Sequence, residues 1–247
     1  MKATYLLAGL FLLSLASQSA WAGPPYATDD PEPVELKHWE FYLASMTSHD
    51  DGGWTGTSPH VEVNYGAAPN LQLHVIAPFA FSKPTESPFQ EGYGDTEVGA
   101  KYRFLEETDN RPQIGEFALV ELPTGDNSRE LGEGHLQVFL PIWLQKKLGQ
   151  WLMYGGGGYW FEPATKVNWW LAGYMLQRQV RDDLALGIEV FHTTAKSADA
   201  PRETRFNVGV VYDISDLHHL MLSAGRGVEG PNLFQSYLAC QLTIGPK

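Results

Sequence analysis

Apolar residues recur at every second position in successive stretches of about ten residues along most of this chain. In the clearest stretch, residues 94–105, the apolar side chains of Val98, Tyr102 and Phe104 alternate with charged side chains. A period of two indicates a β-strand with one apolar and one polar face. A long series of such strands, separated by turns, is typical of a transmembrane β-barrel. The sequence therefore predicts an all-β fold, an antiparallel transmembrane barrel.

The pattern predicts twelve strands within a range of ten to fourteen, because strand boundaries are the weakest part of such an assignment. An even number of strands places both termini of the chain on the periplasmic side. Longer connections are expected at residues 48–57, 82–93, 123–133, 194–203 and 226–232. The strands are expected at about residues 38–47, 58–66, 71–81, 94–105, 113–122, 134–145, 151–161, 169–180, 184–193, 204–213, 218–225 and 233–244.

The first residues have the layout of a secretory signal peptide. Lys2 supplies a positive charge, an apolar core follows, and Ala20-Trp21-Ala22 forms a small-x-small cleavage site. The apolar core is shorter than the roughly 20 residues of a membrane-spanning helix, which disfavours an anchor. We therefore expect the outer membrane of a Gram-negative bacterium, after cleavage near Ala22. The expected parts are a signal peptide (residues 1–22), an N-terminal arm in the periplasm or the lumen (23–37) and the barrel (38–247).

Composition agrees with an envelope protein. The formal net charge of −12 argues against nucleic acid as a partner. Aromatic residues make up 13% of the chain, which suits the two aromatic girdles of a barrel. The single cysteine, Cys240, excludes an intramolecular disulfide, and it is expected on the lipid face of the last strand.

Alternation also predicts which side chains face the lumen, because Lys or Arg on the lipid face at mid-membrane costs about 2–4 kcal/mol. These side chains either fill a small closed barrel with an ion-pair network or line a solute path and set its charge preference. Both alternatives remain open. The lumen-lining candidates are Glu62, Asn64, Gln72, His74, Glu97, Lys101, Arg103 and Glu189.

The N-terminal arm is rich in proline and acidic residues and cannot form a regular helix or a central strand. Its Asp29 and Asp30 are plug candidates, which could enter the lumen and pair with Lys101, Arg103 or Arg178. A periplasmic tail is the alternative.

Two further features have alternative explanations. The glycines Gly155–Gly158 interrupt a strand pattern, which indicates a bend or room for something bulky in the lumen. His192, with Thr193 or Ser197 nearby, is the best candidate for a hydrolase site, but no recognisable nucleophile motif surrounds it. No metal or cofactor site is expected.

Several segments resemble a known family. They are Thr28-Asp29-Asp30-Pro31 with Trp39-Glu40, Glu62-Val63-Asn64-Tyr65-Gly66 with Pro69-Asn70-Leu71, residues 94–104, and Leu122-Pro123-Thr124-Gly125-Asp126. The chain resembles the meta-pathway of phenol degradation family, whose members are commonly called outer-membrane transporters. The resemblance implies an outer-membrane barrel that passes hydrophobic or aromatic compounds, and it brings no catalytic residue set.

These observations favour a channel that carries small solutes, including hydrophobic or aromatic ones, by passive passage and without a cofactor. The alternatives are a structural or envelope-interaction barrel with a closed lumen and, less favoured, an outer-membrane hydrolase. The expected partners are outer-membrane lipid and lipopolysaccharide, the barrel-assembly machinery and a small-molecule solute.

Overall fold

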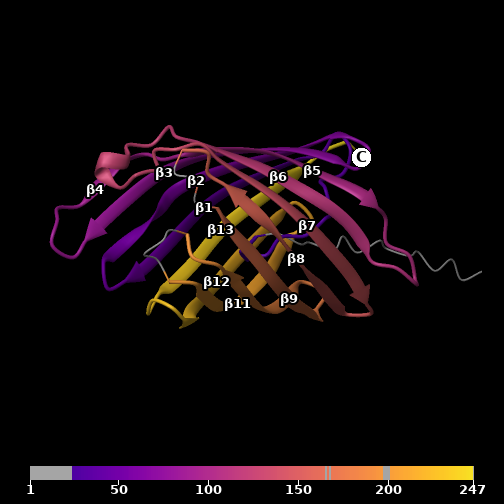
Figure 1. Cartoon of the computed structure of the whole chain (residues 1–247). Coiled ribbons are helices and arrows are strands. Elements are labelled where there is room, and N and C mark those ends of the chain that lie inside the picture. Colours follow the sequence, from indigo (N-terminus) through magenta and orange to yellow (C-terminus); the bar gives the residue numbers. More distant parts are fainter. Residues whose placement is uncertain (1–23, 165, 167, 197–200, 247) are drawn as a thin grey trace, which may run out of the picture.

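The computed structural model describes residues 24–164, 166, 168–196 and 201–246. Thirteen strands form one antiparallel sheet that closes on itself through the pairing of β2 with β3 (Figure 1). Twelve of them build a closed barrel, and β4 is a short extra strand at the edge of β3. The strands are β1 (Trp39–Asp50), β2 (Gly53–Ala68), β3 (Leu71–Pro84), β4 (Gln90–Tyr93), β5 (Thr96–Leu105), β6 (Gln113–Leu122), β7 (Gln137–Leu148), β8 (Trp151–Phe161), β9 (Trp169–Arg181), β10 (Leu184–Thr193), β11 (Glu203–Ser215), β12 (His218–Glu229) and β13 (Phe234–Ile244).

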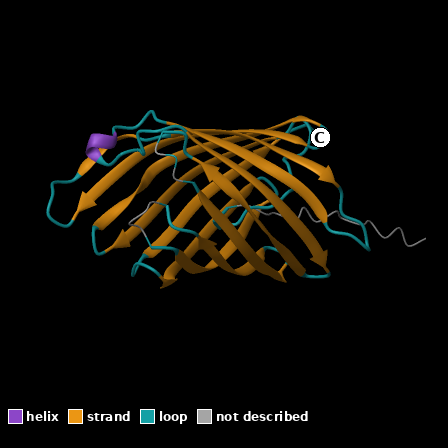
Figure 2. Ribbon diagram, viewed as in Figure 1, coloured by secondary structure: helices purple, strands orange, loops and turns teal. Residues whose placement is uncertain are grey.

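Each barrel strand pairs with its sequence neighbour, and β1 pairs with β13, so that Trp39 lies opposite Ile244. We call the end of the barrel that holds these two residues the terminal end. The opposite end, which carries β4 and the single 3-10 turn η1 (Asn127–Arg129), is the loop end (Figures 1 and 2). Within the described residues, no helix is long and apolar enough to cross a membrane.

The twelve-strand barrel confirms the predicted fold, but three connections differ from expectation. Residues 48–57 were expected as a loop, yet β1 and β2 continue through them to a two-residue turn, with His49 opposite Trp54. Residues 82–93 contain the end of β3 and the extra strand β4. Within residues 226–232, β12 continues to Glu229. These segments contain glycine, serine and threonine and show no apolar alternation. The periodicity therefore gave no sign of the strands, which are recognised in the structure by their hydrogen bonds to neighbouring strands.

The outer face of the barrel is apolar. Tyr102 and Phe104 are about half exposed on it, at 46% and 51%, as the alternation of β5 predicts. Cys240 is exposed and belongs to the outward-facing set of β13, between buried Ala239 and Gln241. The predicted signal peptide and its cleavage site at Ala22 lie outside the described residues.

Candidate functional site

The N-terminal arm, residues 24–36, lies inside the barrel. Thr28 and Asp30 are both fully buried, with 0% exposure. The backbone N–H groups of Ala27 and Thr28 donate hydrogen bonds to the carboxylate of Glu189 on β10. Ser223 on β12 donates a hydrogen bond of 2.5 Å to the carbonyl oxygen of Pro25. The arm is therefore held by side chains from strands that follow it by more than 150 residues.

Glycines on the inner wall make room for the arm. A Cβ atom on Gly187 or Gly209 would lie 2.2 or 2.6 Å from the hydroxyl oxygen of Tyr26. A Cβ atom on Gly173 would lie 2.0 Å from the hydroxyl oxygen of Thr28. Contacts this close do not occur, so these three positions form a hollow that only glycine leaves open.

Lys101 on β5 joins the arm to the opposite wall. Its Nζ lies 2.9 Å from Asp29 Oδ1 and 3.4 Å from Asp30 Oδ2, and 4.8 Å from the ring centre of Phe117. Burial raises the pKa of the Asp30 carboxyl well above its ordinary range, and the nearby ammonium of Lys101 partly opposes this rise. The two plug candidates therefore share one buried cation.

The other two predicted cation partners do not contact the aspartates. Arg103 instead lies 3.5 Å from a carboxylate oxygen of Glu32, the next acidic residue of the arm. The expectation for Arg178 is wrong. Its guanidinium lies 5.2 Å from the ring centre of Trp151, and both residues are exposed on the outer surface near the terminal end. Residue 178 alternates with inward-facing Gln177, which explains its position.

A hydrogen-bonded network covers the inner wall of β2, β3 and β5. Asn64 donates to Glu62 at 2.8 Å, and Asn64 Oδ1 lies 2.6 Å from His74 Nδ1. His74 Nε2 lies 2.9 Å from a carboxylate oxygen of Glu97. Gln72 accepts a hydrogen bond of 2.9 Å from the backbone N–H of Val34, which ties this wall to the arm.

The structure places all eight lumen-lining candidates on inward-facing positions and joins each of them to the arm or to this network. Arg103 and Glu189 contact the arm, as does Lys101. His60, which alternation also turns inward, lies 3.9 Å from Glu62 and extends the network. The full set is Glu62, Asn64, Gln72, His74, Glu97, Lys101, Arg103 and Glu189.

A cavity of about 380 Å³ remains beside the arm at the terminal end. Its walls come from the arm, from the inner faces of β1, β2, β3, β5, β6 and β12, from the turn before β12 and from the end of β13. Tyr42 on β1 donates a hydrogen bond of 2.9 Å to Glu40, and both side chains line the cavity. Sequence analysis missed this pair, although Glu40 alternates with outward-facing Trp39 and Phe41. The carboxylates that line the cavity are Asp29, Glu32, Glu35, Glu40, Glu62 and Asp216.

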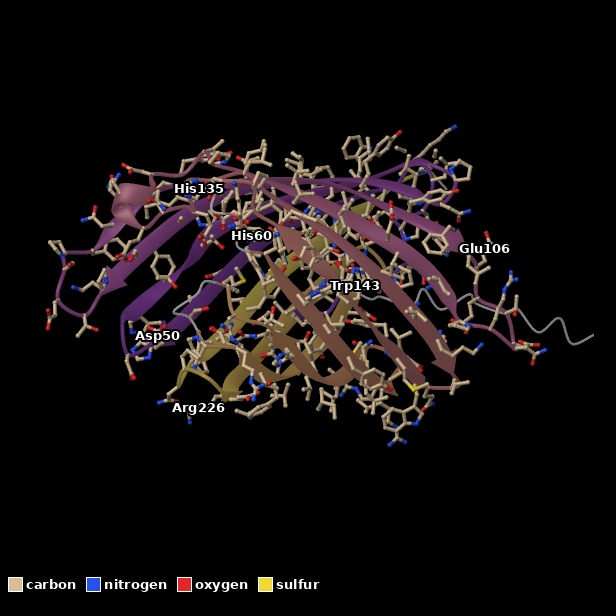
Figure 3. All side chains as sticks on the ribbon, in the orientation of Figure 1. Asp50, His60, Glu106, His135, Trp143 and Arg226 are labelled. Atoms are coloured by element: carbon tan, nitrogen blue, oxygen red, sulfur yellow. The ribbon has the colours of Figure 1, made fainter. Side chains whose placement is uncertain are left out.

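Two of the four glycines of β8, Gly156 and Gly158, make room for aromatic rings in the lumen, as one of the two alternatives predicts. A Cβ atom on Gly156 would lie 3.0 Å from the Trp143 ring, and one on Gly158 would lie 2.7 Å from the Phe139 ring. Trp143 lies between Asp50 and Arg226 toward the loop end and Glu106 at the terminal end (Figure 3). The bulky groups in the lumen are therefore the chain's own side chains.

The candidate hydrolase residues do not come together. His192 and Thr193 are consecutive residues of β10 and point to opposite faces. His192 Nδ1 lies 2.9 Å from the hydroxyl of Thr204, which itself donates to Glu229. This order puts the hydroxyl between base and acid, whereas a nucleophile needs the base between them. Ser197 lies outside the described residues.

Comparisons with known proteins agree with the barrel. The profile of the family described as MetA-pathway of phenol degradation matches residues 44–243. An outer membrane channel from Pseudomonas putida F1 is 18% identical, with a TM-score of 0.69 over 87% of this chain and 98% of that one. The KdgM porin, solved with oligogalacturonate, is 11% identical, with a TM-score of 0.58 over 81% and 98%. The translocator domain of the autotransporter NalP from Neisseria meningitidis is 10% identical, with a TM-score of 0.52 over 83% and 87%. No curated protein sequence matches the chain. At these identities the solved structures establish a shared outer-membrane barrel fold.

Proposed function

Because the chain belongs to the MetA-pathway of phenol degradation family, we propose that it is a passive outer-membrane channel for small solutes, with its N-terminal arm as a plug. The terminal end then faces the periplasm and the loop end faces the outside, as in other bacterial barrels. Selectivity comes from the size and charge of the lumen, so that transport needs no cofactor.

The observation that carries this proposal is the cavity of about 380 Å³ beside the arm. Tyr26 and Thr28 of the arm lie against β9, β10 and β11, whereas the later residues of the arm line the cavity together with β1, β2, β3 and β5. Polar side chains line much of it, among them Glu40, Glu62 and Gln72. A space of this kind admits water and small solutes, and release of the arm would enlarge it.

Deletion of residues 24–33 tests the plug. Reconstituted in planar bilayers, the deletion variant should have a larger single-channel conductance than the full chain. The barrel itself should still fold, since its strands begin at Trp39. Unchanged conductance would contradict the plug, and absence of conductance in both proteins would contradict the channel.

A closed barrel that binds through its loops is the second candidate. It is favoured by the full burial of Thr28 and Asp30, which leaves no open passage along that wall. The same bilayer measurement distinguishes the closed barrel from the channel. A closed barrel should conduct no ions, either before or after small aromatic solutes are added.

We propose that hydrophobic and aromatic compounds are among the solutes, in keeping with the family to which the chain belongs. Liposome swelling should then be faster with benzyl alcohol or phenol than with a sugar of similar size. We also propose that the signal peptide is removed near Ala22 and that the barrel-assembly machinery inserts the chain beside lipopolysaccharide. Depletion of that machinery in cells should leave the protein in the periplasm, in a protease-sensitive form.

A further inference from the structure

A row of carboxylates crosses the inner wall toward the loop end. Glu97 on β5 lies opposite Glu121 on β6, and Glu121 lies opposite Gln137 on β7. Glu162 directly follows Phe161, the partner of Val138, so it comes next to Gln137 at the same level. We call Glu97, Glu121 and Glu162 the acidic row.

Aromatic rings lie one step deeper in the lumen, on the neighbouring strands β7, β8 and β9. Phe139 pairs with Trp160, and Trp160 pairs with Trp169 at the start of β9. The rings of Phe139 and Trp160 stack with centres 4.7 Å apart, and those of Trp160 and Trp169 stack at 5.7 Å. We call these three residues the aromatic row. Because side chains on one face recur every second residue, both rows face the lumen together.

The acidic row is only partly compensated, because His74 Nε2 lies 2.9 Å from Glu97, whereas Glu121 and Glu162 form no ion pair within the described residues. Glu162 is only 7% exposed, and its Oε1 has no hydrogen-bond partner in the described part of the chain. Glu121 lies in the field of Glu97, Glu133 and Asp95, and the ammonium of Lys196 acts in the opposite direction. Burying a carboxylate without a partner is unfavourable, so a cation that enters the lumen gains from these groups.

Lys196 indicates what such a cation would contact. Its ammonium lies 6.0 Å from the ring centre of Trp169, close enough for a cation–π interaction, and it interacts electrostatically with Glu121. The amine of Lys196 thus lies between an aromatic face on one side and carboxylates on the other, which is the environment that the two rows provide. Lys196 is itself exposed and comes from a loop, so another amine could replace it.

The space and the spacing favour an organic cation over a metal ion. Glu97, Glu121 and Trp160 point into the lumen, yet each is only partly buried, so their free surface belongs to the lumen. In the part of the chain that the structure describes, no three acidic, histidine or cysteine side chains converge closely enough to hold a metal ion. A longer ligand, with its charge at one end, can contact both rows at once.

We propose that the loop end of the lumen holds a binding subsite for organic cations, in which an ammonium group lies at the acidic row and a planar aromatic body stacks on the aromatic row. Lys196 occupies this subsite when no ligand is bound. The proposal rests on the channel function only for the route by which the ligand arrives.

Calorimetric titration of the full chain in detergent tests the subsite directly, with 2-phenylethylammonium as the probe. Neutral 2-phenylethanol keeps the ring without the charge, and ethylammonium keeps the charge without the ring. We expect the probe to bind about tenfold more tightly than either, which corresponds to about 1.4 kcal/mol. Equal binding of all three compounds would overturn the proposal.

Variants locate the site. Glu121→Gln and Trp160→Leu should each weaken binding of 2-phenylethylammonium about tenfold, and Lys196→Gln should strengthen it by removing the internal competitor. Glu86→Gln, which removes the same charge from an exposed loop, should leave binding unchanged. If Trp160→Leu does not fold, the other two variants decide, and unchanged binding in both would refute the subsite.

Planar-bilayer conductance of the same proteins separates this proposal from the channel. A protein that binds the probe as expected but does not conduct would keep the subsite and refute the channel. A protein that conducts but binds the three compounds equally well would support the channel and refute the subsite.

Discussion

Lys101 is the residue on which the docking of the arm depends most. Its ammonium is buried between Asp29 and Asp30, and no other cation contacts either aspartate in the described residues. Removing one partner of a buried ion pair leaves an uncompensated charge and typically costs about 3–5 kcal/mol. A loss of that size on the docked arm shifts the arm toward release.

Lys101→Met should therefore increase the single-channel conductance in planar bilayers, in the direction of the arm deletion. Methionine has a similar length and is apolar, so it removes the charge and can still contact the Phe117 ring over which the lysine Nζ lies. Lys146→Met is the matched control, because Lys146 pairs with Glu107 in the turn at the terminal end, 3.1 Å away and apart from the arm. Equal conductance in Lys101→Met and the control would contradict a role in docking.

Asp30 makes the docking of the arm sensitive to pH. Its pKa is raised in the docked arm by burial, whereas a released arm would have a solvated carboxyl with an ordinary pKa. Docking therefore takes up a proton at a pH between the two values, and its contribution is lost as the pH rises through the docked value. We expect the fraction of high-conductance openings to increase with pH.

Asp30→Asn removes this titration and should flatten the pH dependence of those openings. The measurement is the fraction of high-conductance openings, recorded over a series of pH values in both proteins. A slope with pH that is the same in both proteins would show that another group controls the arm.

At the scale of elements, alternation predicted the barrel well because lipid and lumen impose opposite requirements on successive residues. Glu97, Lys101 and Arg103 could be assigned to the inner face from β5 alone, without knowledge of any partner. The contacts of the arm could not be assigned this way. Tyr26 fits against Gly187 and Gly209, which are more than 150 positions later, and no local pattern links them. The residues that bind the arm could therefore be predicted from the sequence only where they are charged.

The glycine hollow offers a test of that long-range fit. Gly187→Val places a branched side chain where the Tyr26 hydroxyl lies, so it should displace the arm and increase conductance. Adding Tyr26→Ala to Gly187→Val should produce no further increase, because both changes remove the same contact. Additive effects in the double variant would show that Gly187→Val disturbs the barrel instead, which an altered shift on heating in gel electrophoresis would reveal.

At the scale of the whole molecule, the arm and the cavity divide the terminal half of the lumen between them. The arm neutralises Lys101 with two aspartates and places its remaining acidic groups beside those of β1 and β2. The cavity consequently carries six carboxylates, Asp29, Glu32, Glu35, Glu40, Glu62 and Asp216, against the single lysine Lys101. An excess of one sign in a confined passage concentrates the opposite ion.

Cations should therefore pass more readily than anions, and Glu40→Gln should lower that preference several-fold. Glu40 suits the test because it accepts its hydrogen bond from the Tyr42 hydroxyl, which can donate to the glutamine oxygen equally well. The measurement is the reversal potential under a potassium chloride gradient.

Because the Debye length falls from about 10 Å at 0.1 M salt to about 3 Å at 1 M, the preference for cations should weaken at high salt. Glu116→Gln is the control, since this carboxylate is exposed on the outer face between inward-facing Gly115 and Phe117. A preference that survives Glu40→Gln unchanged would mean that ions follow a path which avoids the cavity, and the arm would then have to open another route.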